Sequence, residues 1–171
     1  MYPKFVKFLL ALAAVAALSA QDLPPKGGSY AETRKDTKHL TVTTSASLES
    51  VAPGKRLALA VDVAPKPTMH VYSPGQDGYI GITLTLDADS SFTASKAKYP
   101  AGEKIYMPLL KETQLVYAKP FRIAQDVVAR PARGAESLTI KGTLRYQACD
   151  DAICYLPTNV PVSWTLKVAS K

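Results

Sequence analysis

Cysteine is the residue type whose number and spacing in this sequence say most about chemistry. The chain has two cysteines, Cys149 and Cys154, with four residues between them. That spacing suits a tight β-hairpin, whose arms bring two Cβ atoms within the roughly 3.5–4.5 Å that a disulfide needs. A disulfide that closes so short a loop stabilises the fold little, on the order of 2 kcal/mol. The spacing therefore leaves two readings open: a redox-active disulfide used in thiol exchange, or a short structural disulfide.

Two acidic residues directly follow the first of these cysteines. Asp150 and Asp151 place negative charge beside both sulfurs, and nearby carboxylates disfavour the thiolate form of cysteine. The reduced pair is then expected to be a slow nucleophile, and each sulfur a poor leaving group. We therefore expect exchange to occur chiefly with a protein that docks on the site and supplies or relieves charge.

Cu(I) binding is a further alternative for the same residues. Thiolate and thioether ligands suit this ion, so Cys149 and Cys154 could bind it together with Met69, Met107 or His70. Nothing in the spacing of these residues requires such a site. We expect neither a resident metal nor another cofactor.

The two histidines offer little independent chemistry. His39 and His70 belong to no recognisable motif for zinc binding or nucleophilic catalysis. Both are expected at the surface or at a strand edge. Signatures of Ser/His/Asp hydrolases and phosphate-binding glycine loops are also absent from the sequence, so the function is sought at the cysteines.

The N-terminal residues predict export. Two lysines precede an apolar run over residues 8–17, and small residues suited to signal peptidase follow it. This layout predicts a signal peptide over residues 1–20, with cleavage after Ser19 or Ala20. An uncleaved membrane anchor is the alternative, but the run is shorter than the roughly 20 residues that span a bilayer. We expect a mature protein outside the cytoplasm, without stable membrane insertion, where an oxidising environment favours pairing of the cysteines.

The charge of the chain is basic, with a formal net charge of +7 at neutral pH. Export argues against nucleic acid as a partner, and no Lys/Arg cluster is interleaved with aromatic residues along the sequence. We interpret the charge as a solvated basic surface that also favours encounter with acidic partners.

Beyond the predicted signal peptide, the sequence is typical of an all-β fold. Residues 21–37 lack apolar periodicity and are expected to form a disordered leader. Residues 38–171 contain about seven or eight short alternating runs between turn residues, which predict an antiparallel β-sandwich. The predicted strands lie within residues 39–44, 56–63, 69–72, 80–86, 121–124, 137–146 and 160–168. Trp164 is expected in the core of the last strand.

One segment does not follow the strand pattern. Residues 99–110 contain two prolines and a glycine, yet they are rich in large apolar side chains. A long loop of this composition must bury those side chains against something. Two interpretations remain open: the loop plugs one end of the sandwich, or it forms a lid over a reactive site.

The segment around the cysteines resembles a known family. In residues 144–157, a strand ending in Tyr-Gln leads to Cys149, a short acidic linker, and Cys154 followed by Tyr-Leu-Pro. This arrangement is similar to the N-terminal periplasmic domain of the thiol:disulfide interchange protein DsbD. Residues 69–75 and 99–117 match that domain more loosely, so the resemblance extends over about residues 38–168.

The resemblance implies an immunoglobulin-like sandwich in the periplasm whose cysteine pair lies on a hairpin under a cap loop. It implies that the domain receives electrons and passes them to thioredoxin-fold proteins as a protein-disulfide oxidoreductase. By this resemblance Cys154, which precedes Tyr155, forms the mixed disulfide with the partner, and Cys149 resolves it. Tyr106, with its neighbour Met107, is the expected contact of the cap with the disulfide.

The sequence also departs from the family pattern. The linker between the cysteines has four residues, where well-known members have five. The chain is expected to lack the membrane domain and the C-terminal thioredoxin domain of a full DsbD. A membrane reductase or a thioredoxin-like protein would then supply electrons in trans. A non-catalytic exported immunoglobulin-like binding module, with a structural hairpin disulfide, remains the alternative function.

Overall fold

The computed structural model describes residues 33–108 and 111–169, and every regular element in them is a β-strand. The strands are β1 (Arg34–Asp36), β2 (Leu40–Ala46), β3 (Ser50–Val51), β4 (Arg56–Pro65), β5 (His70–Tyr72), β6 (Thr83–Leu86), β7 (Phe92–Ala94), β8 (Glu103–Met107), β9 (Glu112–Tyr117), β10 (Phe121–Ala129), β11 (Ser137–Tyr146), β12 (Ala148–Cys149) and β13 (Thr158–Val168).

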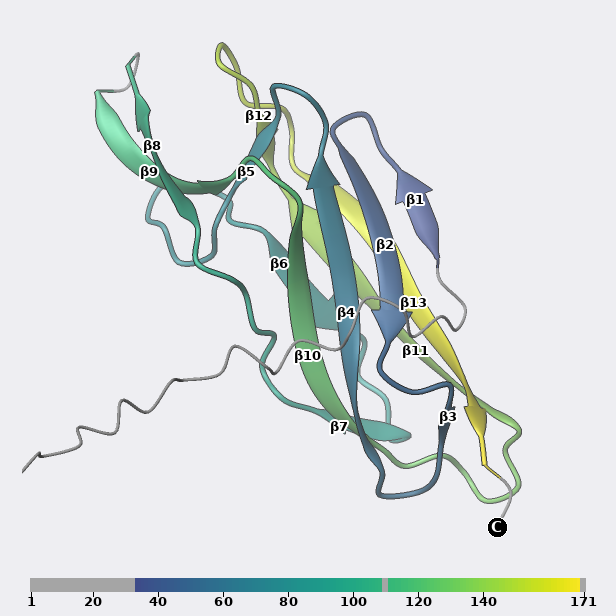
Figure 1. The fold of residues 1–171 in the computed structure, drawn as a ribbon. Helices are drawn as coiled ribbons and strands as arrows, with labels where there is room; N and C mark the ends of the chain where they lie inside the picture. Colours follow the sequence, from purple (N-terminus) through teal and green to yellow (C-terminus); the bar gives the residue numbers. More distant parts are fainter. Residues whose placement is uncertain (1–32, 109–110, 170–171) are drawn as a thin grey trace, which may run out of the picture.

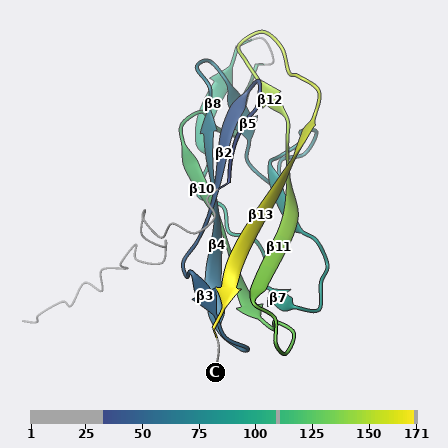
Figure 2. The same cartoon turned by 90° about the vertical axis from the view of Figure 1, so that its right-hand side faces the viewer.

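Two sheets lie face to face and form a sandwich (Figures 1 and 2). One has the strand order β1-β2-β4-β10-β7, and the other β3-β13-β11-β6. All pairings are antiparallel except that of β3 with β13. This arrangement confirms the predicted all-β, immunoglobulin-like sandwich.

The core follows from the period-two alternation of the long strands. In β2 and β11 every second residue is buried while its neighbours face outward, because successive side chains point to opposite faces of a sheet. Trp164 on β13 is 1% exposed, and its indole N–H donates to the carbonyl oxygens of Ser45 (2.9 Å) and Ala60 (3.2 Å) in the opposite sheet. The predicted core role of Trp164 is confirmed.

A third, smaller sheet, with the order β12-β5-β9-β8, covers one end of the sandwich. It is connected to the main sheets by chain continuity: β11 runs through a single residue, Gln147, into β12, and β13 begins four residues after Cys154. The β11–β13 ladder pairs ten residues on each strand, from Ser137↔Lys167 to Tyr146↔Thr158. The longest strand pair of the sandwich therefore holds the cysteine segment at its tip.

Two sequence-based expectations need correction. The predicted leader of residues 21–37 lies mostly outside the described residues, but its last part, Arg34–Asp36, forms β1 and pairs with β2. Its charged residues suit an exposed edge strand. Because such a strand needs no alternating apolar residues, the periodicity of the sequence did not reveal it. The segment of residues 99–110 is not one long loop, because β8 within it pairs with β9 as a hairpin.

The predicted signal peptide, residues 1–20, lies outside the described residues. Within the part of the chain that the structure describes, no helix is long and apolar enough to cross a membrane.

Candidate functional site

The two cysteines form a disulfide across the tip of a short hairpin. They face each other as an antiparallel bridge pair with Cα atoms 4.0 Å apart. Backbone hydrogen bonds hold the turn: the amide of Tyr155 donates to the carbonyl of Ala148 at 2.8 Å, and the amide of Asp150 donates to that of Ile153 at 3.0 Å. The hairpin geometry that the four-residue spacing predicted is thus present.

The two sulfur-bearing residues differ sharply in accessibility. Cys149 is 1% exposed and belongs to a small buried cluster with Tyr72 and Val116. Cys154 is exposed, on the far arm of the hairpin. A protein that approaches the disulfide from solvent therefore reaches the sulfur of Cys154 first.

Asp150 stabilises the turn between the cysteines. Its carboxylate accepts hydrogen bonds from the amides of Ala152 and Ile153, both at 2.8 Å, and from the hydroxyl of Tyr155 at 2.8 Å. The amide hydrogen bonds and the Tyr155 hydroxyl lower the pKa of Asp150, and the same contact raises the pKa of Tyr155. Asp151 is exposed beside it. The role of Asp150 that the contacts support is to hold the turn, in addition to placing charge near the sulfurs.

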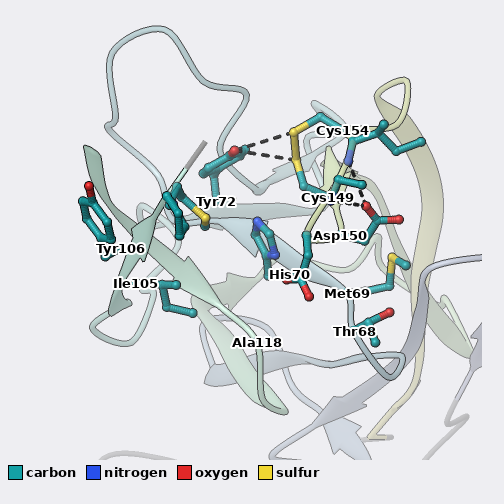
Figure 3. Close-up of a pocket in the computed structure, with 15 residues that line it drawn as sticks. Thr68, Met69, His70, Tyr72, Ile105, Tyr106, Ala118, Cys149, Asp150 and Cys154 are labelled. Atoms are coloured by element: carbon teal, nitrogen blue, oxygen red, sulfur yellow. Dashed lines mark hydrogen bonds between the residues drawn. A yellow bond between two sulfur atoms is a disulfide. The ribbon is translucent and has the colours of Figure 1, made fainter. Parts of the chain in front are cut away.

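Tyr72 is the side chain that touches the disulfide most directly (Figure 3). Its hydroxyl oxygen lies 3.6 Å from the sulfurs of both Cys149 and Cys154. Disulfide sulfurs have no hydrogen to give, so the phenol is the donor. Burial raises the pKa of Tyr72, and the charge of Glu112 adds to that shift, so the hydroxyl keeps its proton at neutral pH.

Aromatic and hydrogen-bond contacts hold Tyr72 in position. Its ring packs on that of Tyr79, with centroids 4.4 Å apart. The hydroxyl of Tyr79 donates to the carboxylate of Glu112, which raises the pKa of Tyr79 to about 12, and Gln114 donates to the same carboxylate at 2.8 Å. These contacts come from β9 and from the segment after β5, so they fix the position of Tyr72 under the disulfide.

The histidines are not where the sequence placed them. His39 and His70 are 7% and 6% exposed, respectively, so neither is a surface residue. His70 lies on β5, between β12 and β9, and pairs directly with Cys149. His39 packs on the ring of Tyr155 with centroids 4.4 Å apart. The sequence-based expectation was wrong because residues distant in sequence cover both side chains, Tyr155 at His39 and the β12 strand beside His70.

Of the expected cap pair, Tyr106 and Met107, it is Met107 that the β8–β9 hairpin packs toward the disulfide. Ile105 and Met107 pack against the cluster that contains Tyr72 and Cys149. Tyr106 lies between them in sequence and therefore points to the opposite face of β8; it is 58% exposed and turned away from the sulfurs in Figure 3. Tyr106 lines the cleft together with Ile105 and Met107, and its cap contact with the disulfide stays a prediction.

A cleft of about 730 Å³ opens between the β8 strand and the cysteine hairpin. Met69, His70 and Met107 line it together with both cysteines, so the ligands considered for Cu(I) do lie in one place. Among residues 33–108 and 111–169, however, no group of three or more His, Cys, Asp or Glu side chains is arranged to hold a metal ion.

The residues named from the sequence that line this cleft are the two cysteines, Asp150, Asp151, Tyr106 and Met107. Tyr155 adjoins them through its hydrogen bond to Asp150. Sequence reasoning missed Tyr72 and did not single out Ile105. The contact of Tyr72 with the sulfurs joins residues 77 and 82 positions apart. No local pattern reveals such a contact. The one available signal was that the predicted strand over residues 69–72 ends in an aromatic residue.

Three solved structures are similar to this chain, and the first of them supports the fold. The N-terminal periplasmic domain of ScsB from Proteus mirabilis is similar with a TM-score of 0.51 and 13% sequence identity, over 77% of this chain and 48% of that one. This chain thus spans about half the length of that protein. The reduced DsbD N-terminal domain from Neisseria meningitidis gives a TM-score of 0.43 at 18% identity, covering 64% of this chain and 81% of that one. The GAE domain of GGA2p from Saccharomyces cerevisiae gives 0.44 at 12% identity, covering 80% of this chain and 97% of that one.

At the level of sequence, no curated protein matches this chain. A family match does exist, and it covers residues 37–163, from just after β1 into the last strand, β13. The matched range includes the disulfide, Tyr72 and the β8–β9 hairpin. The chain therefore belongs to the family described as thiol:disulfide interchange protein DsbD, N-terminal.

Proposed function

We propose that this protein is an exported thiol:disulfide exchange protein that carries electrons between periplasmic redox proteins through Cys149 and Cys154. The observation that carries the proposal is the unequal accessibility of the two sulfurs, with Cys154 open to solvent and Cys149 buried under Tyr72. An exchange reaction needs one sulfur that a partner reaches and a second that resolves the mixed disulfide.

The exchange proceeds in two steps. In the reduced protein, the Cys154 thiolate attacks the disulfide of an oxidised partner, forms a mixed disulfide, and releases one partner sulfur as a thiolate. The Cys149 thiolate then attacks the sulfur of Cys154, closes the intramolecular disulfide, and releases the second partner thiolate. Two electrons pass to the partner, and the two protons lost by the cysteines balance those that the partner thiols take up.

Reduction of the oxidised protein follows the same two steps in reverse. A dithiol donor supplied in trans attacks the exposed sulfur of Cys154, and Cys149 leaves as a thiolate. The Tyr72 hydroxyl already lies 3.6 Å from that sulfur and stabilises the developing charge by a hydrogen bond. Thioredoxin-fold proteins, which present one accessible cysteine, are the class of partner and donor that this one-sided access suits.

The first test asks whether the disulfide opens without loss of the fold. The mature protein is titrated against glutathione and dithiothreitol buffers while circular dichroism is followed in parallel. We expect a reduction potential above about −300 mV, the range of labile functional disulfides, with the same spectrum in both states. Because the loop is short, reduction should lower the free energy of unfolding by only about 2 kcal/mol. Unfolding on reduction would instead make the disulfide structural and the protein a binding module.

The second test assigns the two sulfurs. The Cys149→Ser variant, mixed with an oxidised thioredoxin-fold protein, should accumulate a disulfide-linked complex through Cys154, because no thiol remains to resolve it. The Cys154→Ser variant is the matched control and should trap little, since Cys149 is buried. Equal trapping by both variants would contradict the assignment.

A further inference from the structure

His70 is a buried titratable residue that the exchange steps above leave without a role. Its side chain lines the cleft beside the disulfide, and it is 6% exposed. Its Nε2 atom has no hydrogen-bond partner among the residues that the structure describes. A buried polar atom without a partner destabilises a folded protein, so a functional role for His70 is worth seeking.

The strand register places His70 next to the buried sulfur. His70 on β5 and Cys149 on β12 are directly paired in an antiparallel ladder. Paired residues project to the same face of a sheet, with Cβ atoms about 4.5–5.5 Å apart. Tyr72, whose hydroxyl donates to the sulfurs, also contacts His70: the two rings meet edge-on with centroids 5.9 Å apart. His70, Tyr72 and Cys149 therefore share one side of the small sheet.

The surroundings determine which protonation state His70 has. Burial lowers the pKa of His70, and the charges of Asp151 and Asp150 act in the opposite direction without overcoming it. At neutral pH the imidazole of the oxidised protein is therefore largely neutral and is able to accept a proton. The other titratable groups facing it are the Tyr72 hydroxyl, which stays protonated, and, after reduction, the Cys149 thiol.

We propose that His70 is the residue that accepts the proton of the Cys149 thiol when this cysteine resolves the mixed disulfide. The proton moves from Sγ of Cys149 to the imidazole of His70, and the resulting thiolate attacks the sulfur of Cys154. The partner leaves as a thiolate, and the imidazolium then gives its proton to that thiolate or to solvent. The proposal rests on the proposed function, because it assigns a part in the same exchange step.

The assignment explains how a buried thiol beside two carboxylates becomes reactive. Burial and the charges of Asp150 and Asp151 both favour the neutral thiol of Cys149. A neighbouring imidazolium favours the thiolate and offsets these effects. Cys154 has no such need, because it is exposed to water and its charge is solvated.

Nuclear magnetic resonance of the unmodified protein tests the proton transfer directly. The chain contains only two histidines, so two imidazoles are followed against pH in the oxidised and the reduced protein. We expect the titration of His70 to move to higher pH on reduction, coupled to that of a thiol, while the titration of His39 stays in place. His39 is a matched reference because it is also buried with an unpartnered Nε2, and it lies outside the cleft. An unchanged His70 titration would overturn the proposal.

A kinetic test separates the two cysteines. Reduced protein is mixed with one equivalent of 5,5′-dithiobis(2-nitrobenzoate), which releases one coloured thiolate when Cys154 attacks and a second when Cys149 resolves the adduct. In the His70→Phe variant, the second phase should slow about tenfold at neutral pH, equivalent to one unit of thiol pKa, and the difference should vanish at high pH. The first phase should not change. The His39→Phe variant should leave both phases as in the wild type.

The outcomes distinguish this proposal from the proposed function. If the redox titration shows a labile disulfide but His70→Phe leaves the second phase unchanged, the proton acceptor is not His70 and the exchange function stands. Slowing of both phases at all pH values would indicate a structural effect and would also contradict the proposal. If the redox titration shows that the protein unfolds on reduction, the disulfide is structural, and both the proposed function and the role of His70 are contradicted.

Discussion

Tyr72 is the residue whose single hydroxyl group bears most directly on the redox chemistry. Because it donates to both sulfurs at 3.6 Å, and hydrogen bonds to a thiolate are stronger than those to a disulfide, it favours the reduced, ionised state. The Tyr72→Phe variant should therefore have a reduction potential more negative by roughly 20–30 mV, corresponding to about 1 kcal/mol. Redox titration at a pH where the thiols ionise measures this shift.

The neighbouring Tyr79 provides the control for that measurement. Its ring stacks on Tyr72, but its hydroxyl donates to Glu112 and not to sulfur. The Tyr79→Phe variant should leave the reduction potential unchanged. Equal shifts in both variants would show that loss of either hydroxyl perturbs the site alike, so that the hydrogen bond from Tyr72 to sulfur is not what sets the potential.

Asp150 gives the cysteine turn a pH-dependent stability. Its pKa in the folded protein is lowered by hydrogen bonds from the amides of Ile153 and Ala152 and from Tyr155. Its contribution is therefore fully present above the unfolded pKa of about 3.9 and is lost as the pH falls through the lower, folded value. Urea unfolding of wild type and Asp150→Ala should differ at neutral pH and converge in acid. The Asp151→Ala variant, altered at the exposed neighbour, should follow the wild type, and a difference that persists unchanged in acid would contradict this account.

The β8 strand shows at the level of one element how alternation controls access to the disulfide. Met107 packs toward Tyr72 and Cys149, whereas Tyr106 points outward. The Met107→Ala variant should therefore speed reduction of the disulfide by dithiothreitol several-fold, because it removes a side chain packed against the cluster that contains Cys149 and so opens that sulfur to attack in addition to Cys154. Stopped-flow measurement of the reduction rate tests this expectation.

The adjacent residue makes a matched comparison. The Tyr106→Ala variant removes a larger side chain from the same strand, but from its outer face, so we expect little change in the rate of reduction by a small thiol. A faster reaction for Tyr106→Ala than for Met107→Ala would identify Tyr106 as the cap residue, as the family resemblance implied.

The β8 strand also shows which strands the sequence pattern does not predict. The runs of β2, β4 and β11 were predicted because each alternates over seven or more residues against a buried core. β8 was not, because it is short, prolines lie close to both ends, and its inner face has only Ile105 and Met107 as apolar residues. The cysteine hairpin was predictable because its geometry depends on five consecutive peptide units. The contacts of Tyr72 and His70 with it depend on pairing between distant strands, which local spacing does not encode.

At the scale of the whole molecule, the main core and the redox site are distinct. The large apolar cluster, which includes Trp164, fills the space between the two main sheets. Tyr72, Val116 and Cys149 form a separate cluster at one end. Several chain segments join the small sheet to the main sheets, and Val71, Tyr117 and Ala148 of the small sheet belong to the large cluster. The two clusters nevertheless share no buried residue. Changes in the core should therefore alter stability without altering redox chemistry.

Trp164 provides the test of that separation. The Trp164→Phe variant keeps an aromatic ring in the core but removes the N–H that donates to Ser45 and Ala60 across the sandwich. We expect the free energy of unfolding to fall by about 2 kcal/mol, from the lost hydrogen bonds and the smaller ring, as measured by urea denaturation. The reduction potential should stay within error of the wild type, because no atom of the Tyr72–Cys149 cluster is changed. A shift in potential that accompanies the loss of stability would mean that the sandwich and the redox site are energetically coupled, and that the small sheet responds to the core as one cooperative unit.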